Sequence, residues 1–110
     1  MGEWLEIMNY SDLIFGEIVP KKAFGKDIII VLQHSGKISV FTDICSHQDV
    51  KLSDFGAVSD GKIICYAHNG AFDLGTGEPL CLPARKGLIK WEVKVAAGRV
   101  LVRPTKFFVE

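Results

Sequence analysis

Period-two alternation of apolar and polar residues is the feature that most restricts how this 110-residue chain can fold. In the segment LIKWEVKV, residues 88–95, charged side chains separate the apolar Ile89, Trp91, Val93 and Val95. Successive side chains of a strand point to opposite faces, so this pattern is typical of a half-buried strand. The segment AAGR then turns the chain into a second apolar run, VLVR, at residues 100–103.

Turn signals separate further short apolar segments. The segments DIIIVLQ (27–33) and KISVFTD (37–43) flank HSGK, which predicts a hairpin with glycine in its turn. AVSDGKIIC (57–65) carries the turn signal Asp-Gly, and FDLGTGEPL (72–80) has the same character. No window fits a long amphipathic helix. We therefore predict an all-β fold of short antiparallel strands that form a small barrel or sandwich.

Composition narrows the possible functions. Thirteen basic and thirteen acidic residues cancel, which argues against a nucleic-acid or anionic-membrane binder. The longest apolar run, IIIVL at 28–32, is too short to span a bilayer, and the N-terminus lacks the apolar region of a secretory signal. We expect a cytoplasmic protein whose partners include neither nucleic acid nor membrane.

Two short clips combine one cysteine with one histidine each. Cys45 and His47 lie in ICSHQDV, residues 44–50, and Cys65 and His68 lie in ICYAHNG, residues 64–70. In a reducing cytoplasm, cysteines close to histidines indicate metal binding before a disulfide. Both clips fall at predicted strand ends or in loops, so a small barrel or sandwich would present them from one end.

Spacing alone leaves two kinds of metal centre open. A single zinc ion takes two cysteines and two histidines tetrahedrally. A [2Fe–2S] cluster can instead take two cysteines on one iron and two histidines on the other. The mixed clips favour two neighbouring metal atoms, whereas a catalytic cysteine–histidine pair would account for only one clip. We expect the remaining candidates, His34 and Cys81, to be a surface turn residue and a small buried apolar residue.

The motif CSH followed by CYAHNGAFDLGTGEPL resembles the Rieske [2Fe–2S] proteins. It is most similar to the small Rieske ferredoxins of bacterial multicomponent aromatic-ring oxygenases, and the resemblance covers nearly the whole chain. The tail LPARKGLIKWEVKVAAGRVLV, residues 82–102, resembles the closing strands of that family. One departure is visible, because the family often has proline directly after the second cysteine and this chain has Tyr66.

The resemblance implies a fold and a ligand set. Residues 1–110 would form a single Rieske [2Fe–2S] domain, with a cluster-binding part at about 43–83 inserted in a base formed by 1–42 and 84–110. Cysteine thiolates would hold an inner iron and histidine imidazoles an outer iron, through Cys45, Cys65, His47 and His68. The segment CLPAR, with Pro83, would form a third loop over the one cluster.

The resemblance also implies a function. The chain would be a soluble one-electron carrier that passes electrons from a flavin-dependent NAD(P)H reductase to a terminal oxygenase, without catalysis of its own. Alternatives are an electron-transfer subunit of another redox system, such as nitrite reductase, and a structural zinc module. A detached Rieske domain of a terminal oxygenase carries less weight, because the chain is too short for a catalytic half.

High-potential Rieske proteins of respiratory complexes carry features that this chain lacks. Their loops are joined by a disulfide, and a serine and a tyrosine donate hydrogen bonds to cluster sulfurs. The matching positions here are Val50, Ala67, Gly70 and Phe72. We therefore expect a reduction potential near the bottom of the Rieske range of roughly −150 to +300 mV.

Overall fold

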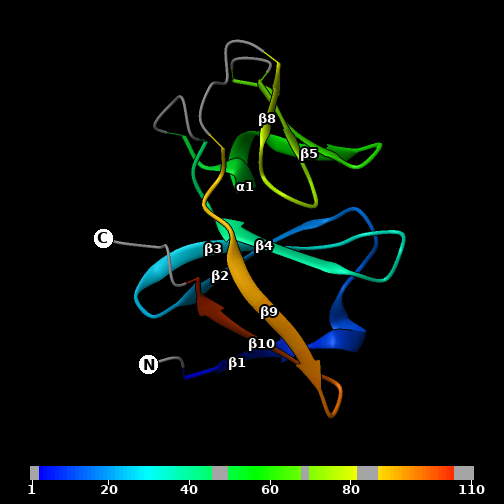
Figure 1. Cartoon of the computed structure of the whole chain (residues 1–110), viewed down its shortest axis with the longest axis vertical. Coiled ribbons are helices and arrows are strands. Elements are labelled where there is room, and N and C mark those ends of the chain that lie inside the picture. The colour runs from blue at the N-terminus through cyan, green and yellow to red at the C-terminus, as the bar shows by residue number, and fades with distance from the viewer. Residues whose placement is uncertain (1–2, 46–49, 68–69, 82–86, 106–110) are drawn as a thin grey trace.

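Three antiparallel sheets, stacked one above another, make up the computed structural model (Figure 1), which describes residues 3–45, 50–67, 70–81 and 87–105. The lower sheet has the order β1 (Leu5–Asn9), β10 (Arg99–Pro104) and β9 (Trp91–Ala96). The middle sheet has the order β2 (Ile18–Ala23), β3 (Lys26–Leu32) and β4 (Ile38–Thr42). The upper sheet contains β5 (Gly56–Ser59), β6 (Lys62–Cys65), β7 (Gly70–Asp73) and β8 (Pro79–Cys81).

Helical structure among the described residues is limited to two short turns. A 3-10 turn covers Tyr10–Asp12. The helix α1 covers Leu52–Phe55 and lies between β4 and β5 in the sequence. No helix in these ranges is long and apolar enough to cross a membrane. The predicted all-β class is confirmed, since every described pairing of strands within the three sheets is antiparallel.

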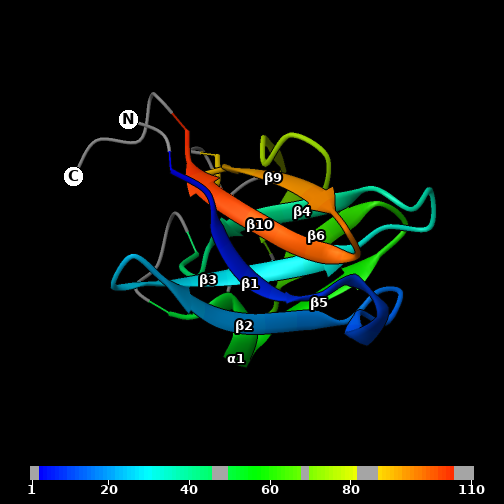
Figure 2. The ribbon, with the colours of Figure 1, turned by 90° about the horizontal axis from the view of Figure 1, so that it is seen from below.

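The middle sheet is covered on both faces, which explains the unbroken apolar run of β3. Ile29 and Val31 enter one core, whereas Ile28 and Ile30 enter the other. A strand buried on both faces needs apolar residues at every position rather than at alternate ones. Figure 2 shows the lower sheet lying across the middle sheet, with β3 visible beside β1.

We call the two cores upper and lower. The upper core lies between the middle and upper sheets and contains Ile29, Val31, Phe41, Cys45, Leu52, Ile63, Cys65, Phe72, Leu74 and Leu88. The lower core lies between the middle and lower sheets and contains Leu13, Ala23, Ile28, Ile30, Leu32, Val40, Trp91, Val100 and Val102. The two predicted metal-ligating cysteines are therefore part of the upper core.

Three tight hairpins share one turn chemistry. The residue pairs Phe24-Gly25, Asp60-Gly61 and Ala97-Gly98 all have positive φ at both positions. Two-residue turns of this kind match the right-handed twist of the flanking strands, and glycine adopts the second position without steric cost. The turns predicted at Asp60-Gly61 and in AAGR are confirmed, as are the hairpins of β3 with β4 and of β7 with β8.

The alternation in residues 88–95 predicted an apolar face that is only partly buried, because the first and last residues of that face are exposed. Trp91 is buried and Val93 is half-buried, but Ile89 and Val95 are 41% and 46% exposed. The strand begins only at Trp91, and Ile89 lies beside the end of β4, where its carbonyl accepts the Thr42 N–H. Val95 lies two residues before the Ala97-Gly98 turn, near the far end of the strand.

Strands β1 and β2 were not predicted. Pro20 lies inside β2, and a proline within an apolar run argues against a central strand. In the structure β2 is at an edge of the middle sheet, where a missing N–H does not interrupt a ladder on both sides.

Hydrogen bonds join the upper sheet to the strands below it. The Ser39 hydroxyl donates to the Leu74 carbonyl at 2.6 Å, and the Lys90 ammonium donates to the Gly75 carbonyl at 2.8 Å. The Leu88 N–H donates to the Gly77 carbonyl, also at 2.8 Å. The loop between β7 and β8 is thereby held against β4 and against the segment that leads into β9, which fixes the upper sheet on its base.

Candidate metal centre

Cys45 lies just after β4, at the start of the first ligand loop. Its side chain is 2% exposed, and its backbone N–H donates to the Val50 carbonyl at 2.9 Å. This bond joins the two described ends of the loop that contains the first clip. The position after a strand agrees with the sequence prediction.

Cys65 is the last residue of β6 and is completely buried. It pairs with Gly56 of β5 on one side and with Gly70 of β7 on the other, so its backbone is fixed by two neighbouring strands. The next residue, Tyr66, donates its N–H to the Phe55 carbonyl at 2.7 Å. The second clip therefore begins on a rigid part of the upper sheet.

The two cysteines are not joined in a disulfide, and both pack in the same upper core. They come from segments 20 residues apart in the sequence, one on each side of α1. A thiolate in apolar surroundings is costly unless a cation compensates its charge. Two buried cysteines from two loops thus fit a metal centre whose inner face is thiolate, which is the arrangement expected for iron–sulfur ligation.

Several predicted site residues lie outside the described residues. These are His47, His68 and Pro83. In the ranges that the structure describes, no three cysteine, histidine or acidic side chains come together as a metal site. The backbone of Cys81 belongs to β8 and pairs with Ala71, but its predicted apolar burial stays a prediction. His34 is exposed and stacks on the Phe15 ring, as expected for a surface turn residue.

The positions that distinguish this chain from high-potential Rieske proteins also belong to this region. Val50 and Ala67 are partly buried and pack against the upper core. Phe72 is fully buried in that core, and Gly70 is the first residue of β7. Phe72 and Gly70 therefore carry no hydroxyl group at the positions where the high-potential proteins have a tyrosine and a serine.

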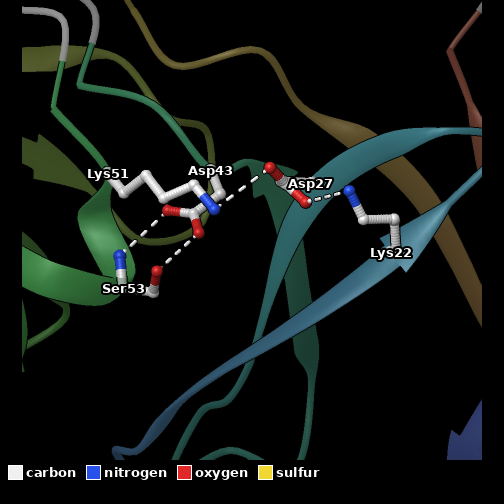
Figure 3. Close-up of polar contacts among 5 residues, drawn as sticks. All are labelled: Lys22, Asp27, Asp43, Lys51 and Ser53. Carbon is white, nitrogen blue, oxygen red and sulfur yellow. Dashed lines mark hydrogen bonds and ion pairs between the residues drawn. The ribbon is translucent and has the colours of Figure 1, made fainter.

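A network of charged and polar groups lies beside the first ligand loop (Figure 3). The Asp43 carboxylate accepts hydrogen bonds from the Ser53 N–H and hydroxyl. The Asp27 carboxylate pairs with Lys22 and Lys51 at 3.0 and 3.1 Å. These hydrogen bonds, from Lys22 first and then Lys51, hold the pKa of Asp27 below its ordinary value. The same Asp27 contact raises the pKa of Lys51.

This network was not predicted from the sequence. Asp43 ends a predicted strand, and Ser53 lies three residues beyond Val50. The distance between them in the sequence matches no metal-ligand or catalytic motif. An aspartate and a serine ten residues apart, with a mostly polar segment between them, give no sequence signal for this contact.

Two buried cysteines, one from the loop after β4 and one from the end of β6, meet in one core of a small all-β protein. This arrangement is typical of a small metal-binding domain. The model of the Rieske [2Fe-2S] domain family matches residues 3–95. This chain belongs to the Rieske [2Fe–2S] family. Its cofactor is therefore one Rieske-type [2Fe–2S] cluster, which decides against the structural zinc module.

Individual relatives agree with this assignment. The ferredoxin component of the naphthalene 1,2-dioxygenase/salicylate 5-hydroxylase systems of Ralstonia sp is 31% identical over 91% of this chain and 94% of the relative. The anthranilate 1,2-dioxygenase ferredoxin subunit of Burkholderia cepacia is 32% identical over 93% of both chains. The predicted role as an electron carrier, without catalysis of its own, is confirmed by these ferredoxin relatives.

A solved structure supports both fold and family. It contains the reduced oxygenase and oxidised ferredoxin of carbazole 1,9a-dioxygenase, and the matching chain is 29% identical, with a TM-score of 0.84. The match covers 96% of this chain and 97% of the other.

Proposed function

We propose that this protein is the ferredoxin component of a bacterial multicomponent oxygenase system. It would accept single electrons from a flavin-dependent NAD(P)H reductase and deliver them to a terminal oxygenase in the cytoplasm. The observation that carries the proposal is the burial of Cys45 and Cys65 in one core, within a chain of the Rieske family. The ferredoxin relatives named above, each belonging to an oxygenase system, support the choice of partner.

We also propose the ligand set and the division of the chain. Cysteine thiolates would hold one iron and histidine imidazoles the other, through Cys45, Cys65, His47 and His68. The cluster-binding part would extend over about 43–83, and 1–42 with 84–110 would form the base. The arrangement of strands supports this division, because β5–β8 form one sheet, whereas β1–β4, β9 and β10 form the other two.

The chain's own residues support an electron-transfer role. When bound, the cluster supplies a one-electron redox couple. Leu52, Ile63 and Phe72 pack with the two thiols and exclude water from them. The segments beside the ligands expose large apolar side chains, including Ile44, Phe55 and Tyr66. We propose that these side chains contact the redox partners, because a partner must approach this end of the protein closely to exchange an electron.

Iron and sulfide analysis, combined with voltammetry, tests the proposal. We expect two irons and two acid-labile sulfides per chain, and a midpoint of about −150 to −100 mV at neutral pH, at the low end of the Rieske range. One zinc and no sulfide would contradict the cofactor and the function together. An intact cluster with a midpoint above about +100 mV on that scale would refute the oxygenase-ferredoxin role alone.

The partners are tested separately by reconstitution. NADH oxidation by a flavin reductase should reduce the ferredoxin, and a reduced Rieske oxygenase should appear only when the ferredoxin is present. The genes beside the one for this chain identify the components to purify. Failure of the neighbouring oxygenase to accept electrons would contradict the proposed partner.

A further inference from the structure

The first ligand loop begins after β4, and the chain continues from Val50 into α1. Its base is closed by the bond from the Cys45 N–H to the Val50 carbonyl. The structure contains a second connection across the same base.

Asp43 makes this connection. Its side chain is 4% exposed, and it accepts the Ser53 N–H at 2.9 Å and the Ser53 hydroxyl at 2.6 Å. Figure 3 shows the two bonds running from the end of β4 to the start of α1. A carboxylate removed from water needs such donors, because an uncompensated buried charge is strongly unfavourable. The pair therefore resists separation far more than an exposed contact of the same geometry.

The backbone of Asp43 is fixed as well. Its N–H donates to the Asp27 carbonyl at 2.9 Å, which ties this residue to β3. The side chain of Asp27 binds Lys51 from the returning end of the loop. That ion pair is solvent-exposed and contributes little on its own, so Asp43 and Ser53 form the principal clamp.

We propose that Asp43 is a positioning residue for the first ligand loop and acts through Ser53 to hold the Cys45 sulfur in place. The clamp fixes the chain two residues before Cys45 and three residues after Val50, so it restrains both ends of the segment that carries the clip. The inference rests on the proposed role of Cys45 as a ligand. With Cys45 as a ligand, a fixed sulfur would keep the thiolate in place and slow the loss of iron.

Substitutions on either side of the clamp test the inference. Asp43→Ala removes both bonds, and Ser53→Ala removes the hydroxyl donor while the backbone bond remains. Asp43→Asn keeps the geometry, because the amide oxygen can accept the N–H and the amide nitrogen can donate to the hydroxyl. Asp54→Ala and Ser59→Ala are matched controls, since both side chains are exposed and lie close by in the sequence.

Three readouts separate positioning from general stability. They are the rate of iron loss to a chelator, the electron paramagnetic resonance g-values of the reduced protein, and the melting temperature of the iron-free protein. We expect Ser53→Ala to accelerate iron loss about tenfold, equivalent to about 1.4 kcal/mol. Asp43→Ala should accelerate it further and shift the g-values, whereas Asp43→Asn should retain the wild-type g-values.

Each outcome decides the matter. If Asp43→Ala and Ser53→Ala match their controls in iron loss and g-values, the proposal is wrong, even if their iron-free forms melt earlier. If Asp43→Ala does not fold, Ser53→Ala alone gives the answer, because it preserves the backbone bond. If the wild-type protein itself holds zinc or no cluster, the proposed function fails instead, and the metal analysis shows this before any variant is compared.

Discussion

Replacing Phe72 with tyrosine should raise the reduction potential by about 20–60 mV. Phe72 is fully buried and packs in the same core as Cys45 and Cys65, four residues after His68. A tyrosine hydroxyl at this position can donate one hydrogen bond toward the sulfur ligands and stabilise the more negative, reduced state. A hydrogen bond has a net value of about 0.5–1.5 kcal/mol. For one electron, about 1.4 kcal/mol corresponds to about 59 mV.

In the iron-free protein, Phe72→Tyr should be destabilising. Without the cluster the nearby cysteines are neutral thiols, which are weak acceptors. The added buried hydroxyl is then poorly paired and should lower the free energy of unfolding by about 1–3 kcal/mol. Film voltammetry measures the first effect, and denaturant unfolding of the iron-free variant measures the second. Phe55→Tyr is the matched control, because this ring is 46% exposed and its hydroxyl would remain in water. Equal midpoints for the two variants, with intact clusters, would refute the reasoning.

Three further substitutions test the core, the ligands and the charged network. Cys65→Ser should prevent stable assembly, because it removes a thiolate from a fully buried site; a complete, unaltered cluster by iron and sulfide analysis would contradict the ligand assignment. Leu52→Ala should lower the free energy of unfolding in urea by about 2–5 kcal/mol, since it opens a cavity beside the two thiols, and a loss below about 1 kcal/mol would show that the core does not depend on this side chain. The free energy of unfolding should fall less for Asp27→Asn than for the wild type when the pH is lowered below about 4. The folded pKa of Asp27 lies below its unfolded value, so the carboxylate stabilises the protein above the unfolded pKa and loses this effect as the pH falls through the folded one; identical pH profiles of unfolding for wild type and variant would contradict this.

The local features of this fold could be predicted because they depend on residues close together in the chain. Asp-Gly pairs favour positive φ in a turn between strands, so the hairpin at Asp60-Gly61 was evident from the sequence. The hairpin at Phe24-Gly25 was missed, because Phe24 is not a residue that signals such a turn. The cysteines and histidines were candidates on chemical grounds alone. Their spacing, together with the motif around Cys65, indicated the family without any knowledge of the tertiary structure.

Burial could not be predicted in the same way, because it depends on which layer covers a residue. The alternation in β9 places Trp91 and Val95 on the same face of the strand. Trp91 is buried because it packs against residues of the middle sheet, whereas Val95 remains exposed. Burial of β3 also depends on the layers around it, because its apolar residues are covered on both faces only when a core lies on each side of the middle sheet. Strand β2 escaped prediction because the effect of Pro20 depends on whether its strand lies at an edge or in the centre of a sheet.

The sequence by itself determined the all-β class, most of the hairpin turns and the chemical identity of the candidate ligands, since each follows from side-chain chemistry and local backbone geometry. Only the tertiary structure brought the thiols of Cys45 and Cys65 into one core and buried Asp43 against Ser53. These arrangements depend on how three sheets stack. That stacking is decided by the free energy of covering apolar surface over the whole chain, which no short segment contains.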